Sequence, residues 1–281
     1  ELGGILVSAK MDVNWAEERV RRADTAAAAK LERALKTLDD GVQIKRRIIE
    51  ELRPTLLDNL GLSAALEWQL HEICDRAGLA CDQLGRRCVE IQADLSSIEP
   101  IPRMIEETLS GLGRLDILVN NAGTIRRADA VDFSEQDWDD VMNVNLKSAF
   151  FLCQAAGRHF IANGGGKIIN IASMLSFQGG IRVPSYTASK SGIAGITRLL
   201  ANEWGGKGVN VNAIAPGYMV TDNTAPLRAD AERSKAILDR IPAGRWGEAS
   251  DLGGAAIFLA SRASDYVNGA ILPVDGGWLA R

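Results

Sequence analysis

The sequence predicts an α/β protein: a doubly wound, mainly parallel sheet that lacks its first two strands and follows an all-α segment. After residue 82, short β-branched or apolar runs alternate with longer helical stretches, which is typical of a parallel sheet covered by helices on both faces. Before residue 82 only helical periodicity is present. Polar residues follow several of the apolar runs, where strands would end and where such sheets bind ligands.

Residues 1–81 are predicted to form a helical segment. Apolar residues recur at helical spacing from Leu2, and a charged, alanine-rich stretch over 26–52 carries one apolar stripe. Pro54 ends or kinks that helix. Long amphipathic helices with little other structure need a partner to cover their stripes. We therefore expect this segment to serve dimerisation; the alternative is a helical hairpin used only for packing.

Residues 82–281 contain the predicted sheet. Its strands are expected at 88–93, 115–119, 167–172, 209–215 and 270–274. The helices between them are expected around 102–110, 136–163, 186–204 and 251–261. The candidate site lies at the carboxyl ends of these strands.

Composition excludes several classes of protein. The chain has 281 residues, 46% of them hydrophobic, and a net charge of −4, which indicates a globular protein and argues against a nucleic-acid partner. It contains no long apolar run and no charged-then-apolar leader, so we expect no membrane span, no secretory signal and a cytoplasmic location. The four cysteines, Cys74, Cys81, Cys88 and Cys153, include no Cys-x-x-Cys pair, which predicts free thiols and no metal site.

The motif that indicates chemistry is Tyr186-Thr187-Ala188-Ser189-Lys190. A spacing of four residues puts the phenol and the ammonium on one face of a helix. A lysine near a tyrosine stabilises the phenolate and lowers the tyrosine pKa, so the hydroxyl can exchange a proton with a substrate alcohol or carbonyl. Ser173, at the end of an apolar run, could hydrogen-bond to the same oxygen. By itself this spacing also occurs on solvated helix faces, which is the alternative interpretation.

Further motifs in a fixed order connect this one to a family. Residues 84–281 resemble the short-chain dehydrogenase/reductase family, whose sheet is Rossmann-like, and within it members that act on keto sugar acids. The resemblance rests on Asn120-Asn121-Ala122-Gly123, Asn143-Val144-Asn145, Ser173, the Tyr186 motif, Pro216-Gly217 and the longer matches over 171–186 and 274–281.

The resemblance implies hydride transfer between NAD, with NADP not excluded, and a small keto or hydroxy sugar acid, in a homo-oligomer. Tyr186 would be the acid/base, and Lys190 would lower its pKa and hold the nicotinamide ribose. Ser173 would orient the substrate oxygen, and Asn145 would position a proton-relay water. Besides Tyr186 and Lys190, the implied cofactor contacts are Asp94, Leu95, Asn120, Ala122, Gly123, Pro216, Gly217, Met219 and Thr221.

A sugar acid carries a carboxylate, which guanidinium groups bind through two parallel hydrogen bonds. The candidates are Arg126, Arg127 and Arg182. Arg182 is the best placed of the three by sequence, because it lies four residues before Tyr186. For each of them the alternative is an ordinary surface salt bridge.

One motif of the family is missing from the sequence. A complete member opens with a strand, a Thr-Gly-x-x-x-Gly-x-Gly turn and a helix whose N-terminus receives the cofactor pyrophosphate. Gly3-Gly4 follows no predicted strand, and Gly111-Leu112-Gly113 precedes one, so neither replaces the turn. The strand at 88–93 must then pair directly with 115–119, or both keep an unpaired edge. We expect weakened cofactor binding and impaired activity.

Residues 1–80 carry a second resemblance. Together with Glu1-Leu2-Gly3-Gly4, the stretch 50–66 resembles the dimerisation and phosphoacceptor domain of nitrate-sensor-type histidine kinases. Neither His71 nor His159 occupies the phosphoacceptor position, so the resemblance implies helix pairing without phosphotransfer. The alternative function is a helical dimerisation module joined to an inactive dehydrogenase body, or a fusion with no intact function.

Overall fold

The computed structural model describes Leu31 and residues 87–281. Residues 89–281 form one compact unit. Apart from Leu31, the predicted helical segment 1–81 lies outside the described residues, and so do its predicted dimerisation role and its kinase-like resemblance.

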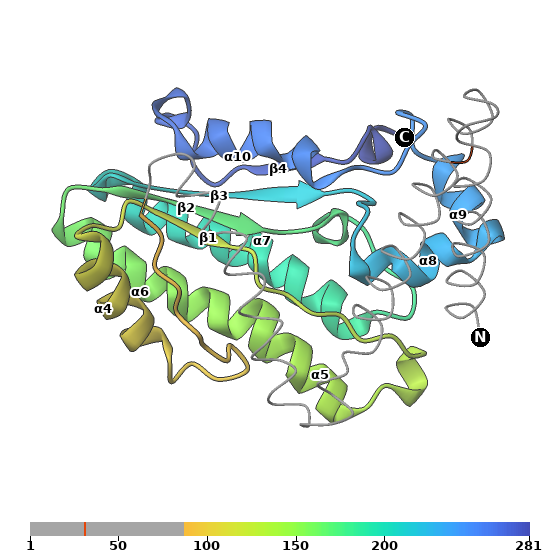
Figure 1. Cartoon of the computed structure of the whole chain (residues 1–281), viewed down its shortest axis with the longest axis horizontal. Helices are drawn as coiled ribbons and strands as arrows, with labels where there is room; N and C mark the ends of the chain where they lie inside the picture. Colours follow the sequence, from red (N-terminus) through yellow and green to blue (C-terminus); the bar gives the residue numbers. More distant parts are fainter. Residues whose placement is uncertain (1–30, 32–86) are drawn as a thin grey trace, which may run out of the picture. The chain divides into compact units, whose positions relative to one another are not determined.

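Four parallel strands in the order β1-β2-β3-β4 make the sheet of the described unit (Figure 1). β2 and β3 are central, and their register pairs Ile168 with Val211. Apolar residues run along both central strands and are almost fully buried, as a parallel sheet covered on both faces requires. The strands are β1 Ile117–Asn120, β2 Gly166–Ile171, β3 Val209–Pro216 and β4 Ile271–Val274.

Helices cover both faces of this sheet. Helices α4, α6 and α7 lie on one face and α10 on the other (Figure 1). Phe160 of α6 and Leu200 of α7 pack against β2 and β3 on the first face, and Leu259 of α10 packs on the second. The α-helices are α4 Ile101–Leu112, α5 Glu135–Met142, α6 Ser148–Ala162, α7 Pro184–Trp204, α8 Ala225–Ala229, α9 Ala231–Leu238 and α10 Gly253–Ala260.

The helix predicted over 136–163 is confirmed: α5, a π-helical turn and α6 follow one another without a break in the helical backbone from residue 135 to residue 162. A π-helical turn, Asn143–Lys147, separates α5 from α6. Such turns insert an extra residue into the helical register and are frequent at functional sites. Asn145 lies inside this turn and is buried.

The strand predicted at 88–93 is wrong. These residues form no strand, and Val89 is 38% exposed. A strand needs a hydrogen-bonding neighbour, and here the described sheet offers none in register. Within the described residues β1 pairs only with β2, and its side chains Ile117 and Val119 are 40% and 50% exposed. Of the two expected outcomes, the unpaired edge is the one observed for β1.

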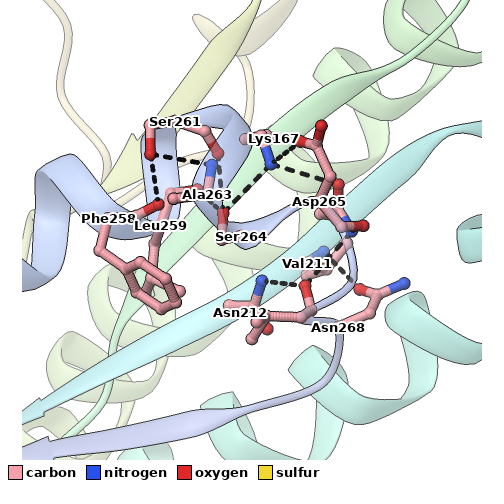
Figure 2. A network of polar contacts seen from close by, with 12 residues as sticks. Lys167, Val211, Asn212, Phe258, Leu259, Ser261, Ala263, Ser264, Asp265 and Asn268 are labelled. Carbon is pink, nitrogen blue, oxygen red and sulfur yellow. Dashed lines mark hydrogen bonds and ion pairs between the residues drawn. The ribbon is translucent and has the colours of Figure 1, made fainter.

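A network of polar contacts lies at the amino ends of the strands (Figure 2). The candidate site is expected at the opposite, carboxyl ends. Lys167 Nζ, near the start of β2, lies 2.9 Å from an Asp265 carboxylate oxygen and donates to Ser264 Oγ at 3.1 Å. The Val211 N–H of β3 donates to Asn268 Oδ1 at 2.7 Å. The network ties the segment after α10 to both central strands.

None of the described helices is both long enough and apolar enough to span a bilayer.

Candidate active site

The structure brings Ser173, Tyr186 and Lys190 together at the carboxyl edge of the sheet. Ser173 follows β2, and Tyr186 and Lys190 lie in the first turns of α7, which packs against β3. The Ser173 hydroxyl is near enough to the Tyr186 phenol to lower its pKa, and Lys190 Nζ lies 5.6 Å from the centroid of the Tyr186 ring. The face of α7 that carries Tyr186 and Lys190 is therefore turned toward the end of β2.

Two opposing effects set the pKa of Tyr186. Burial raises the pKa, because it disfavours the phenolate. The hydrogen bond from Ser173 and the positive charge of Arg127 act in the opposite direction, but the net pKa stays above its usual value. The phenol is therefore protonated at neutral pH.

Lys190 is held by a backbone carbonyl. Only 4% of its surface is exposed, and Nζ donates to Ile171 O at 2.6 Å. Burial lowers its pKa to about 8. The groups that oppose the rise in the Tyr186 pKa are Ser173 and Arg127, while the Lys190 ammonium donates to the end of β2, so the effect expected of Lys190 on this pKa stays a prediction.

Asn145 joins the loop after β1 to α7. Its side chain accepts from the Thr124 N–H at 2.8 Å and donates to Thr124 O at 2.9 Å. Its Nδ2 also lies 3.3 Å from Ser189 Oγ. A Cβ added at Gly123 would sit 3.5 Å from Asn145 Oδ1, so this loop passes close to the asparagine. The π-helical turn thus directs one amide at both the loop after β1 and α7.

Asn120 ends β1 and carries an unpaired acceptor. Its Nδ2 donates to Asn170 Oδ1 at 2.8 Å and lies 3.1 Å from Cys153 Sγ. Its Oδ1 is buried and has no hydrogen-bond partner among the described residues. A buried acceptor without a donor is a candidate contact for a ligand, because leaving it unpaired costs free energy. The next residues, Ala122 and Gly123, are exposed at the same edge.

The loop after β3 passes close to the end of β4. A Cβ at Gly217 would lie 2.5 Å from Asp275 Cα, so only glycine fits there. Met219 is buried and forms a β-bridge with Gly247, whereas Thr221 is exposed. A cavity of about 230 Å³ lies between this loop and residues 241–247 and 274–276.

The three candidate arginines have different surroundings. Arg126 is paired with Asp137 and Asp140 of α5, at 3.4 and 3.2 Å. Arg127 donates to a backbone carbonyl of the segment after β3 at 2.7 Å, and its charge acts on the Tyr186 phenol.

Arg182 is not the best placed of the three, contrary to the prediction from spacing. Its side chain is 61% exposed and pairs with Asp129 at 3.0 Å. The spacing argument fails because α7 begins at Pro184, so Arg182 lies before the helix, at a positive φ of 62°.

No contact recorded among the described residues links Asp94 or Leu95 to Ser173, Tyr186 or Lys190. The Asp94 carboxylate accepts from the Ser96 N–H and Oγ, both at 2.8 Å, and the backbone bond is the larger cause of its lowered pKa. Both residues lie in the segment that was wrongly predicted to end a strand.

Two site contacts were missed from the sequence. Ser189, which faces Asn145, lies inside the Tyr-x-x-x-Lys motif, so its position was a usable signal. The Ile171 carbonyl that holds Lys190 is a backbone group and leaves no signal in the sequence.

Comparison with known proteins adds the family. A family model described as enoyl-(acyl carrier protein) reductase matches residues 57–279, starting upstream of the boundary predicted at residue 82. A 2-dehydro-3-deoxy-D-gluconate 5-dehydrogenase of Escherichia coli (strain K12) is 68% identical over 199 residues, covering 70% of this chain and 79% of that protein. The chain belongs to the short-chain dehydrogenase/reductase family. It is therefore an oxidoreductase.

Other relatives agree with this membership. A 2-dehydro-3-deoxy-D-gluconate 5-dehydrogenase of Bacillus subtilis (strain 168) is 59% identical over 200 residues, covering 71% of this chain and 78% of that protein. A crystal structure of a putative 2-deoxy-D-gluconate 3-dehydrogenase from Agrobacterium tumefaciens with bound NADP is 60% identical. It has a TM-score of 0.68 and covers 74% of this chain and 82% of that one.

Proposed function

We propose that this chain transfers a hydride between NAD or NADP and the keto or hydroxy carbon of a sugar acid such as 2-dehydro-3-deoxy-D-gluconate. The relatives from Escherichia coli and Bacillus subtilis are named for that substrate, and the Agrobacterium tumefaciens structure contains NADP. The observation that carries the proposal is the grouping of the half-buried Tyr186 with the buried Ser173 and Lys190 at the carboxyl edge of the sheet.

The described residues fit the nicotinamide-ribose half of the cofactor. Asn120 has a buried, unpaired Oδ1, and the Lys190 ammonium has three donors, of which Ile171 O takes one. The sequence offers no glycine-rich turn for the pyrophosphate. When bound, the cofactor supplies or accepts the hydride. The residues that would hold it are Asn120, Ala122, Gly123, Tyr186, Lys190, Pro216, Gly217, Met219 and Thr221, with Asp94 and Leu95 toward the adenine.

In this proposal Tyr186 gives a proton to the substrate oxygen during reduction. Its raised pKa keeps the phenol protonated, which suits a general acid. Ser173 orients the same oxygen, and Lys190, with a pKa of about 8, holds the ribose and exchanges protons near neutral pH. Asn145 positions a water through an amide that already links the loop after β1 to α7.

Among the arginine candidates we propose Arg127 as the receptor of the substrate carboxylate. It is the one whose charge acts on Tyr186, whereas Arg126 and Arg182 are paired with carboxylates of this chain. A carboxylate bound to Arg127 would cancel part of that charge and raise the Tyr186 pKa further. The bound substrate would thus keep its own proton donor protonated.

The proposal extends to assembly. We infer from the helical periodicity and the kinase-like resemblance of the sequence that residues 1–81 form a helical dimerisation segment and residues 82–281 a dehydrogenase unit, within a homo-oligomer. Light scattering of the full chain over a wide range of concentrations tests this inference. The mass of one chain at every concentration would contradict it.

The test of the reaction is oxidation of NADH or NADPH in the presence of a 3-deoxy-2,5-diketo sugar acid, followed by absorbance. Arg127→Met should raise KM by about 10- to 100-fold, because one charged hydrogen-bonding pair is lost. Arg126→Met is the matched control and should raise KM much less. No consumption of either cofactor by the parent would contradict the function, and an unchanged KM for Arg127→Met would contradict the carboxylate assignment alone.

A further inference from the structure

An aromatic cluster joins the C-terminal end of the chain to the candidate site. It consists of Tyr218, Trp246 and Trp278. The rings of Tyr218 and Trp278 lie 4.8 Å apart and those of Tyr218 and Trp246 5.6 Å apart, both edge to face. Trp278 is only 5% exposed. Such pairs stabilise a structure beyond the area that they bury.

Trp278 is hydrogen-bonded to the last residue of the turn that follows Ser173, residues 173–178, and shares a core cluster with its second residue. Its Nε1 donates to Gln178 Oε1 at 3.3 Å, and its ring packs in one core cluster with Met174. Within the turn, the Gln178 N–H donates to Met174 O at 3.1 Å, and the N–H of residue 175 donates to Ser173 Oγ at 3.2 Å. A movement of the indole would therefore reach the Ser173 hydroxyl through two short paths.

The indole is itself held on several sides. The Asp275 carboxylate accepts from the N–H groups of Gly277 and Leu279, both at 2.9 Å, which fixes the turn that carries Trp278. The Arg240 guanidinium lies 4.0 Å from the Trp278 ring centroid in a cation–π arrangement. On another side the ring meets Tyr218, which belongs to the loop after β3.

We propose that Trp278 is a positioning residue for the reaction: its ring and its N–H hold the turn 173–178 against the loop 217–219 and so fix Ser173 relative to Tyr186. The inference rests on the proposed function, since it assumes that Ser173 and Tyr186 act on the substrate oxygen. The hydrogen bond to Gln178 satisfies a buried indole N–H and at the same time ties the ring to the end of this turn.

The pH dependence of turnover distinguishes positioning from plain packing. The groups that face the Tyr186 phenol are Ser173, Arg127 and, on the same helix, Lys190. Because the Ser173 hydrogen bond opposes the rise in the Tyr186 pKa, loosening it should move the basic limb of the pH profile of keto-group reduction, where Tyr186 acts as the acid, to higher pH. Ser173→Ala should show the same direction of shift.

Trp278→Leu should lower kcat by about 10- to 100-fold and move the basic limb upward, because a misplaced hydroxyl costs rate. Trp204→Leu is the matched control: Trp204 packs in the core against Gly157, away from the turn 173–178. It should lose stability but keep the parental pH profile when both variants are assayed well below their unfolding transitions. A parental kcat and profile for Trp278→Leu, or an equal shift for Trp204→Leu, would overturn the proposal.

Two milder variants keep the test decisive if Trp278→Leu does not fold. Trp278→Phe keeps an aromatic ring and removes the N–H, and Gln178→Met removes its acceptor. Both should show a smaller shift of the same sign, and parental profiles for both would overturn the proposal. An inactive parent, or Ser173→Ala with parental activity, defeats the proposed function and this inference together. An active parent with an impaired Ser173→Ala and a parental Trp278→Leu defeats the inference alone.

Discussion

Replacing Lys190 by methionine should remove turnover and yet relieve a cost to folding at neutral pH. Burial of the ammonium lowers the Lys190 pKa from 10.5 to about 8. At 1.36 kcal/mol per pKa unit, that fall corresponds to about 3 kcal/mol of unfavourable free energy for the charged form in the folded state. The variant also leaves Ile171 O without its 2.6 Å donor, which costs about 1–3 kcal/mol. The net gain at pH 7 is then about 0–2 kcal/mol.

The dependence of this difference on pH is the sharper prediction. Below pH 8 both the folded and the unfolded parent carry the charge, so the cost of burying it is fully present. Between pH 8 and 10.5 the folded parent has lost the proton while the unfolded chain keeps it, so the parent gains stability as the pH rises. The stability of Lys190→Met relative to the parent should therefore fall by about 3 kcal/mol across this window.

Urea unfolding of the parent and Lys190→Met at pH 7 and pH 10 measures this change. Lys235→Met, which replaces a lysine on α9 that is 74% exposed, controls for the loss of one positive charge and should not stabilise the protein at pH 7. A difference between parent and Lys190→Met that does not change with pH would refute the reasoning. So would a loss of several kcal/mol by the variant at pH 7.

Three further predictions follow from other contacts. Asn145→Ala should destabilise the protein by about 1–3 kcal/mol in urea unfolding, because two half-buried backbone groups of Thr124 lose their partners. Cys153, whose pKa burial raises to about 12, should resist iodoacetamide at pH 8 in the native protein and react once unfolded, as peptide mass spectrometry will report. Gly217→Ala should destabilise by about 1–3 kcal/mol, whereas Gly179→Ala, with open space around it, should not.

The central sheet could be predicted because its signal is local. The strands expected at 167–172 and 209–215 correspond to β2 and β3, whose β-branched and apolar residues are buried on both faces. The helix expected over 186–204 corresponds to α7, which begins two residues earlier at Pro184. The segment 88–93 has a similar local pattern, but a strand also depends on a neighbour elsewhere in the chain, which no local pattern reveals.

The site divides in the same way. The spacing of Tyr186 and Lys190 was enough to put them on one helix face, because helix geometry alone fixes that relation. The different surroundings of Arg127 and Arg182 depend on how loops cross the carboxyl edge of the sheet. The four-residue spacing from Arg182 to Tyr186 does not place both side chains on one helix face, because α7 begins between them at Pro184. The π-helical turn around Asn145 is set by its hydrogen bonds to Thr124 and Ser189, which are distant in sequence.

The measurement that tests the account most directly is the turnover of Tyr186→Phe beside that of Tyr266→Phe. The first variant keeps the ring against Lys190 and removes the hydroxyl, so general acid catalysis worth about 10²- to 10⁴-fold should be lost. The second removes a hydroxyl from a fully exposed tyrosine and should leave kcat unchanged. If Tyr186→Phe reduces the keto sugar acid at the parental rate, then Tyr186 is not the proton donor, and the roles proposed for Ser173 and Lys190 are wrong with it.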